Sequence, residues 1–341
     1  MNTMRIPNDQ TPYVRFYGRT AVVEDGVFLP WSASGFSVRF CGTSLSATLL
    51  ASNSKVEDAR PYVRVFVDGV QAADIGLFEA KTEVTLAANL AMGEHTVTVL
   101  KRTEASRSFV VLQALTTDGE WLEAPSLNTT RRIQFIGDSI TTGYGVMASS
   151  EQTEFTTAEQ DALAGYAMQI ADALHAEPHL FAISGYAIHR SPYGQPIPPL
   201  YPFVDGVGAC EMPWDFDRFQ PQLTVINLAT NDHAWFCNEC AAHLSEEERH
   251  RQIEDAYYAF LKELQVIHPH SRFLCVIGMM YCFVMEDVER AVARAAAEGI
   301  DVRFCRLPRA EEWRVGHPAP SVHKQAADIL TPLIADWMDW H

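Results

Sequence analysis

The stretch Phe135-Ile136-Gly137-Asp138-Ser139-Ile140-Thr141 decides the fold of this chain. An apolar strand over residues 132–136 leads directly into it, and Gly137 allows a sharp turn after that strand. We expect Ser139 to start the following helix with its hydroxyl exposed, beside unpaired backbone N–H groups that could stabilise an oxyanion. A serine presented in this way is typical of a nucleophile. Gly-Asp-Ser also occurs as an ordinary turn, so the rest of the chain must decide.

Strands alternate with helices from residue 131 onward. The expected strands cover residues 132–136, 179–183, 223–228, 272–277 and 302–305, and the expected helices cover 160–175, 245–268, 288–297 and 321 onward. Ser245 and Glu248 form a capping box at the start of the long helix. The alternation predicts an α/β fold, a three-layer, doubly wound parallel sheet that places ligands at the carboxyl ends of its strands. Ser139, Gly185 and Asn231 all fall at such ends.

The first half of the chain shows short strands and no convincing helix. Alternating or β-branched runs occur at residues 36–40, 45–50, 62–67, 84–86, 96–100 and 109–115, separated by Asp-Gly and similar turns. We therefore expect an all-β sandwich or jelly-roll domain over residues 1–125. A Ser-, Asn-, Thr- and Pro-containing linker at about 124–130 joins it to an α/β domain over residues 131–341.

The composition indicates which partners the protein favours. The chain has 341 residues and a formal net charge of -17, which disfavours nucleic acid and anionic membrane surfaces and fits a neutral sugar or ester. Residues 1–17 lack the apolar core of a signal peptide, so we expect a cytoplasmic protein, or an exported one if the sequence has been trimmed.

Seven cysteines are scattered along the chain and fit a reducing compartment. Cys237 and Cys240 have metal or redox spacing, but no second pair completes a zinc site, and we expect neither a metal nor a cofactor.

Four blocks occur in order along the α/β half: Ser139, then Ser184-Gly185-Tyr186, then Thr230-Asn231-Asp232, then Gly316-His317-Pro318. This arrangement resembles the Ser-Gly-Asn-His hydrolases, also called the GDSL family. The β-rich first half, residues 101–105 and residues 132–141 also look like carbohydrate esterase family 2. The resemblance covers nearly the whole chain and implies O-deacetylation of carbohydrates, with acetylated xylan, mannan or simpler sugars as candidates.

The resemblance also implies a role for each residue of the four blocks. Ser139 would attack the acyl carbonyl, and the N–H groups of Ser139 and Gly185 with the side-chain amide of Asn231 would form the oxyanion hole. His317 would act as general base and acid. A plain turn at Gly185 and an Asx-turn or helix cap at Asn231 are the alternatives that the residues themselves leave open. His323, further along the last helix, is expected to be structural.

The histidine block departs from the commonest pattern. Many relatives place an aspartate two or three residues before the catalytic histidine, where this chain has Arg314 and Val315. Either a backbone carbonyl of residues 313–316 holds the imidazole in a Ser-His dyad, which we favour, or Glu311 or Glu312 folds back.

A second departure is Ala229, where relatives commonly carry glycine. It adds one methyl group to that loop, and we expect the loop to tolerate it.

Aromatic and polar side chains near the blocks could contact a sugar, with core packing as the alternative for each aromatic residue. The candidates are Tyr144, Tyr186, Trp214, His233 and Trp235, with Arg190 and Tyr193 at the rim. Two other functions remain open: a lipase or thioesterase of the same fold, and a carbohydrate-binding protein with weak or no turnover.

Overall fold

The computed structural model describes residues 1–7, 11–127, 129–238, 241–280 and 282–341. It divides into two compact units, one of residues 1–128 with 155–162 and one of residues 129–154 with 163–341. The segment Phe155–Ala162 therefore belongs to the first unit, although it follows Ser139 in the sequence.

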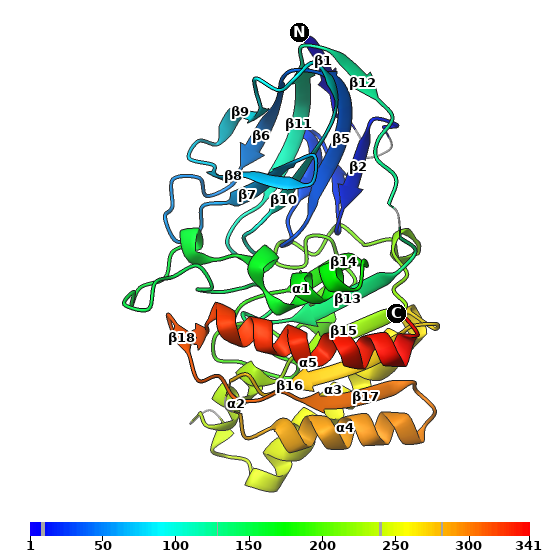
Figure 1. The fold of residues 1–341 in the computed structure, drawn as a ribbon. Coiled ribbons are helices and arrows are strands. Elements are labelled where there is room, and N and C mark those ends of the chain that lie inside the picture. Colours follow the sequence, from blue (N-terminus) through cyan, green and yellow to red (C-terminus); the bar gives the residue numbers. More distant parts are fainter. Residues whose placement is uncertain (8–10, 128, 239–240, 281) are drawn as a thin grey trace. The chain divides into compact units, whose positions relative to one another are not determined.

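The first unit is a sandwich of two antiparallel sheets (Figure 1). One sheet has the order β3-β4-β11-β6-β9 with β1 on β11, and the other has the order β12-β5-β10-β7-β8 with β2 on β5. Apolar side chains of both sheets, such as Leu49 and Phe36, form one buried cluster. The strands are β1 (Asn2–Arg5), β2 (Val14–Tyr17), β3 (Ala21–Val23), β4 (Gly26–Leu29), β5 (Gly35–Gly42), β6 (Leu45–Ala51), β7 (Tyr62–Val67), β8 (Val70–Gly76), β9 (Lys81–Ala87), β10 (Gly93–Lys101), β11 (Val110–Thr117) and β12 (Glu120–Leu122).

Charged side chains hold the segment Phe155–Ala162 within the first unit. Asp161 is fully buried and accepts a hydrogen bond from the Arg64 guanidinium at 2.7 Å. Arg102 donates to the carbonyl oxygens of Ala158 at 3.0 Å and Gln160 at 3.1 Å. These contacts give a structural role to part of the segment at residues 101–105 that carries the family resemblance.

The second unit contains a parallel sheet with the order β14-β13-β15-β16-β17. Its strands are β13 (Arg132–Gly137), β14 (Glu177–Ala182), β15 (Leu223–Asn227), β16 (Arg272–Ile277) and β17 (Val302–Arg306). The strand order reverses at β13, which has β14 on one side and β15 on the other. In folds of this type, ligands bind at such a switch point, which here lies at the carboxyl ends of β13, β14 and β15.

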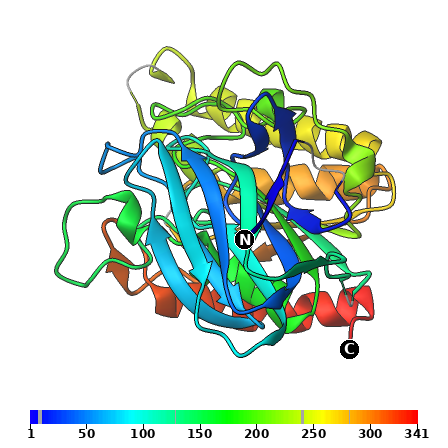
Figure 2. The ribbon, with the colours of Figure 1, turned by 90° about the horizontal axis from the view of Figure 1, so that it is seen from above.

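Helices cover both faces of this sheet. Helix α1 (Tyr166–Ala173) packs against α5 (Pro320–Met338), and α3 (Glu246–Ile267) packs against α4 (Met285–Ala297). Figure 2 shows α5, in red, on one side and α3 and α4, in yellow and orange, on the other. Helix α1 begins later than expected because Gly165 is its N-cap. The predicted fold class, an all-β domain followed by a doubly wound α/β domain, is confirmed.

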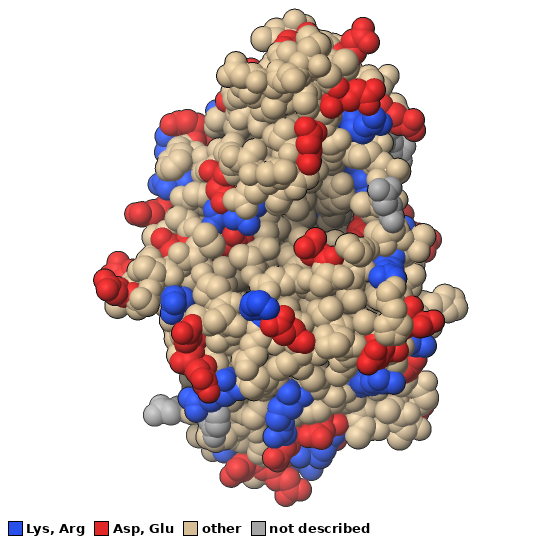
Figure 3. Space-filling view, viewed as in Figure 1, with Lys and Arg blue, Asp and Glu red and all other residues tan. Residues whose placement is uncertain are grey.

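Among the residues that the structure describes, no helix combines the length and the apolar composition needed to span a bilayer. On the face seen in Figure 3, acidic and basic side chains are interspersed and no extended patch of Lys and Arg gathers. That face offers no broad basic surface to a polyanion.

Candidate active site

Ser139 lies in a run of turns directly after the carboxyl end of β13. Glycine is required at position 137 because a Cβ there would lie 2.0 Å from Oγ1 of Thr141. The Asp138 carboxylate accepts a hydrogen bond from the Ile140 N–H at 3.0 Å and so fixes the backbone on both sides of the serine. The sharp turn predicted from Gly137 is therefore present.

The expectation that Ser139 begins a helix with an exposed hydroxyl is wrong. Gly143 and Gly145 have φ angles of +66° and +70°, which a right-handed helix excludes, so the chain continues in turns. Ser139 is 6% exposed. Its N–H donates no hydrogen bond to any residue that the structure describes.

Gly185 lies two residues after Ile183, in the loop that follows β14. Its φ is +82°, and a Cβ there would lie 3.0 Å from the Cβ of Tyr193, so this position requires glycine for both reasons. Within the described part of the chain, the Gly185 N–H also donates no hydrogen bond. Two backbone N–H groups at the end of the sheet are thus free to meet a negative charge.

Thr142 connects the loop that carries Ser139 (the serine loop) to the loop that begins with Gly185 (the glycine loop). Its hydroxyl donates to the Ser139 carbonyl at 3.0 Å and lies 3.2 Å from the hydroxyl of Ser184, which precedes Gly185. Sequence reasoning missed Thr142, because a threonine three residues after the serine carries no signal without the fold.

Asn231 lies in the first turn of a short helix, α2 (Thr230–Phe236), which follows β15. Its side-chain nitrogen donates to the Tyr186 carbonyl at 2.9 Å and to the Asp138 carboxylate at 3.3 Å. The amide therefore lies between the glycine loop and the serine loop. The preceding Ala229 has φ +90°, in the region that favours glycine, so the departure at Ala229 places strain in the backbone and does more than add a methyl group.

Asp232 is a supporting residue that the sequence did not reveal. Its buried carboxylate accepts backbone hydrogen bonds from Ile188 at 2.9 Å, His189 at 2.8 Å and Arg190 at 3.0 Å. Burial raises the pKa of Asp232 to about 6, against the opposing effect of these three N–H groups. Asp232 therefore anchors the loop that begins with Gly185.

His317 follows a two-residue turn between β18 (Trp313–Arg314) and β19 (His317–Pro318). Its Nδ1 lies 3.3 Å from the carbonyl oxygen of Val315, and its ring is 4.2 Å from the ring of Tyr144, centroid to centroid. The Tyr144 N–H donates to the Ser139 carbonyl at 3.1 Å, which connects the histidine to the serine loop. Burial lowers the pKa of His317 below its ordinary value, so the neutral imidazole dominates at neutral pH.

The two glutamates considered as partners of His317 lie elsewhere. The Glu312 carboxylate accepts a hydrogen bond from the Ser321 hydroxyl at 2.5 Å, and Glu311 is exposed. The carbonyl arrangement expected for a Ser-His dyad is the one that the structure contains. His323 is buried and accepts a hydrogen bond from the Tyr166 N–H at 3.2 Å, and burial lowers its pKa to about 4.

The predicted sugar contacts divide into two groups. Tyr144 and Tyr186 are half-buried and lie on the serine and glycine loops, and Tyr193 is 73% exposed at the rim. His233 is half-buried on α2, and its Nδ1 accepts a hydrogen bond from the Phe283 N–H at 3.2 Å. In a neutral His233 that accepts at Nδ1, the ring proton lies on Nε2.

The two tryptophans of that prediction have packing roles. Trp235 is 3% exposed and meets His189 edge to face at 4.9 Å, and the exposed Arg190 lies over its ring at 5.9 Å. Trp214 is 6% exposed and packs on His179 at 5.5 Å. His179 lies in the middle of β14, so Trp214 is not brought to the carboxyl edge of the sheet. Neither tryptophan offers a free face to a sugar.

No cluster of three or more His, Cys, Asp or Glu side chains arranged for a metal ion occurs in the described ranges. Cys237 is exposed, with its Sγ 3.9 Å from Nδ1 of His233. Cys240, the other half of the pair noted in the sequence, lies outside the described residues.

Family models and relatives agree with this architecture. The carbohydrate esterase 2 N-terminal model matches residues 16–125, and the GDSL-like lipase/acylhydrolase model matches residues 135–328, more than half of the chain.

Curated relatives include cellulase/esterase CelE of Acetivibrio thermocellus, which is 28% identical over 98% of this chain. This chain spans only 40% of the length of that protein. An acetylxylan esterase / glucomannan deacetylase of Cellvibrio japonicus is 26% identical over 96% of this chain and 90% of its own.

Among solved structures, a family two carbohydrate esterase from Clostridium thermocellum in complex with cellohexaose matches with a TM-score of 0.86 and 26% identity. The match covers 96% of this chain and 100% of that one. The resemblance to carbohydrate esterase family 2 predicted from the sequence is thus confirmed. The chain belongs to the GDSL-like lipase/acylhydrolase family, and its first half carries the N-terminal domain of carbohydrate esterase family 2.

Proposed function

We propose that this chain is a carbohydrate O-acetyl esterase in which Ser139 is the nucleophile and His317 the general base. One observation carries the proposal: Ser139, Gly185, Asn231 and His317 are connected through Thr142, Tyr186 and Tyr144 at one end of the sheet. Two unoccupied N–H groups lie among them. The esterase family to which the chain belongs agrees with this chemistry.

In the proposed mechanism, His317 Nε2 removes the proton of Ser139 as Oγ attacks the acetyl carbonyl. The free N–H groups of Ser139 and Gly185 stabilise the tetrahedral oxyanion. The Asn231 amide joins them by releasing its 3.3 Å hydrogen bond to Asp138, because its two N–H groups are otherwise donated to Asp138 and Tyr186. His317 then returns the proton to the sugar oxygen that leaves. Water, activated by the same imidazole, hydrolyses the acetyl-serine and releases acetate.

Neither Ser139 Oγ nor His317 Nε2 makes a hydrogen bond to a described residue of the chain. Catalytic hydrogen bonds often shorten only when substrate is bound, so these two atoms can still act as nucleophile and base without a hydrogen bond between them here. The Val315 carbonyl would hold the Nδ1 proton and thereby keep Nε2 as the proton acceptor.

Acetylated xylan and mannan fragments are the proposed substrates. The support is the relative from Cellvibrio japonicus named acetylxylan esterase / glucomannan deacetylase, which aligns over 96% of this chain. The half-buried rings of Tyr144 and Tyr186 supply apolar faces suited to a sugar.

The first test is hydrolysis of 4-nitrophenyl acetate by the wild type, Ser139→Ala, His317→Ala and the double variant, with a metal chelator present. We expect a loss of at least about a thousandfold that is similar in all three variants, because nucleophile and base act as one unit. Ser184→Ala is the matched control: it removes a neighbouring hydroxyl and should lose less than about tenfold. Equal rates for the wild type and Ser139→Ala would refute the proposed nucleophile.

A second candidate is carbohydrate binding with weak turnover. The observation that favours it is that a carbonyl oxygen, and no carboxylate, lies at Nδ1 of His317. Acetate release from acetylated xylo-oligosaccharides, measured beside binding of cello-oligosaccharides, separates the two functions. Binding without acetate release would favour the second candidate, and faster hydrolysis of long-chain 4-nitrophenyl esters would favour a lipase.

A further inference from the structure

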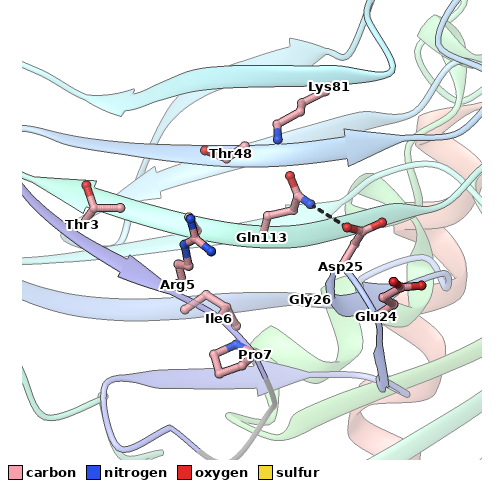
Figure 4. A pocket seen from close by; sticks show the side chains of 11 residues that line it. Thr3, Arg5, Ile6, Pro7, Glu24, Asp25, Gly26, Thr48, Lys81 and Gln113 are labelled. Atoms are coloured by element: carbon pink, nitrogen blue, oxygen red, sulfur yellow. Dashed lines mark hydrogen bonds between the residues drawn. The ribbon is translucent and has the colours of Figure 1, made fainter.

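A groove of about 500 Å³ lies on the outer face of the sheet that contains β6, β9 and β11 (Figure 4). It is formed entirely within the first unit, and its volume falls in the range of small-molecule sites. The side chains that matter for its chemistry are Arg5, Asp25, Thr48, Lys81 and Gln113. None of them belongs to the candidate active site.

A β-bulge builds the floor of this groove. The register of β11 against β6 shifts between Leu112 and Ala114, which leaves Gln113 as the extra residue. Leu112 and Leu115 are fully buried, so Gln113 and Ala114 both face outward and both line the groove. A bulge redirects side chains in this way and often lies next to a binding site.

The turn between β3 and β4 builds one wall. Gly26 has φ +141°, and a Cβ there would lie 2.2 Å from the Leu112 carbonyl oxygen, so only glycine lets this turn approach the bulge so closely. The approach brings Asp25 to Gln113, whose side-chain nitrogen donates to the Asp25 carboxylate at 3.3 Å. This bond leaves the Gln113 carbonyl oxygen, Oε1, pointing into the groove as an acceptor (Figure 4).

Two positive charges in the groove lack partners. Neither the Arg5 nor the Lys81 side chain makes an ion pair or hydrogen bond with any residue that the structure describes. The other four lysines of the chain are all engaged: Lys55, Lys262 and Lys324 in ion pairs, and Lys101 with two carbonyl oxygens. The groove is also lined by the acidic residues Glu24 and Asp25, so its described lining carries no net formal charge. Arg5 and Lys81 are the groups there that could meet a carboxylate, and the acidic and amide side chains are the ones that could accept hydrogen bonds from hydroxyl groups.

We propose that this groove binds a uronic acid residue, free or within an oligosaccharide. Arg5 and Lys81 would hold the carboxylate through charge-assisted hydrogen bonds. Asp25, Oε1 of Gln113 and the Thr48 hydroxyl would accept hydrogen bonds from the sugar hydroxyls. The described lining of the groove contains no aromatic ring, so charge and hydrogen bonding would supply the affinity, and binding would weaken with salt.

Calorimetry on the full chain tests this site with glucuronic acid, glucose and inorganic phosphate as probes. Glucuronic acid should bind best, and Arg5→Gln and Lys81→Gln should each weaken its binding about tenfold or more, as expected for loss of a charge-assisted bond. Arg39→Gln and Lys55→Gln are the matched controls, because they remove one positive charge each from the same unit outside the groove. All four variants should keep the turnover of 4-nitrophenyl acetate.

Three results would overturn the proposal. Glucose binding as tightly as glucuronic acid would show that the carboxylate is not recognised. Phosphate binding as tightly would show an anion site without recognition of the sugar. Equal losses of affinity for glucuronic acid in the groove variants and the matched controls would show that binding depends only on the net charge of the protein. Because esterase activity is followed in the same variants, failure of this site and failure of the esterase assignment are separate outcomes.

Discussion

Asp232→Asn is the substitution that tests how the loop that begins with Gly185 is held. One carboxylate oxygen accepts the N–H groups of His189 and Arg190, and the other accepts the N–H of Ile188. An asparagine oxygen can keep the first pair, but its NH₂ group would then face the Ile188 N–H. The variant therefore removes one buried hydrogen bond to a charged acceptor and sets two donors against each other.

The expected size follows from that single contact. Loss of a buried hydrogen bond to a charged group costs about 2–3 kcal/mol in the free energy of unfolding, which lowers Tm by about 5–10 °C for a unit of this size. The loop begins with Gly185, and removing one oxyanion donor typically costs about a hundredfold in kcat. A displaced Gly185 N–H should therefore lower kcat about tenfold, with little change in KM for 4-nitrophenyl acetate.

Asp287→Asn is the matched control, because Asp287 is also a fully buried acid of the second unit. Its carboxylate lies 2.7 Å from Nδ1 of His250 and also pairs with Arg290, between α3 and α4. This control should lower Tm and leave kcat unchanged. An assay near pH 8 keeps Asp232 ionised, since burial raises its pKa to about 6. If both variants lose kcat equally, or if Asp232→Asn lowers Tm without lowering kcat, then Asp232 does not position the Gly185 N–H for catalysis.

Three further expectations can be checked with the same assay. Burial lowers the pKa of His317 below 6.5, so kcat/KM should fall on the acid side only below that pH; a pH-rate profile with a higher midpoint would contradict this. Glu311→Gln and Glu312→Gln should each retain kcat within about twofold, whereas loss of a true acidic partner of His317 would lower kcat by orders of magnitude. Gly185→Ala should lower the free energy of unfolding, measured by thermal denaturation, by about 1–3 kcal/mol, because Gly185 has a φ of +82° and lies close to Tyr193. It should lower kcat as well.

The sequence predicted the second unit well because its buried parallel strands are continuous apolar runs. The strand expected at residues 272–277 is β16 with the same bounds, and the Ser245–Glu248 capping box at α3 is confirmed. It predicted the first unit less completely. Strand β8 was missed because it is a largely exposed edge strand with few β-branched residues, and β3 and β12 have only three residues each.

The candidate site could be located from the sequence because topology alone brings the ends of β13, β14 and β15 together. Interactions that depend on tertiary contacts could not be predicted from the sequence. The expected helix at Ser139 gives way to turns in which Gly143 and Gly145 have positive φ angles. The three backbone partners of Asp232 lie more than forty residues away in the sequence, so no local pattern reports them.

The hairpin that carries His317 shows how the imidazole could be oriented without an aspartate before the histidine. Both residues of its turn have positive φ, +49° at Val315 and +75° at Gly316. Such turns favour Asn-Gly, and a β-branched residue there is strained. The hairpin lies close to Gly145, because a Cβ at that glycine would lie only 2.9 Å from the Arg314 carbonyl oxygen and 3.4 Å from Cβ of Val315. The same turn directs the Val315 carbonyl toward Nδ1 of His317. In the proposed mechanism, the strained turn itself orients the base, and no additional side chain is required.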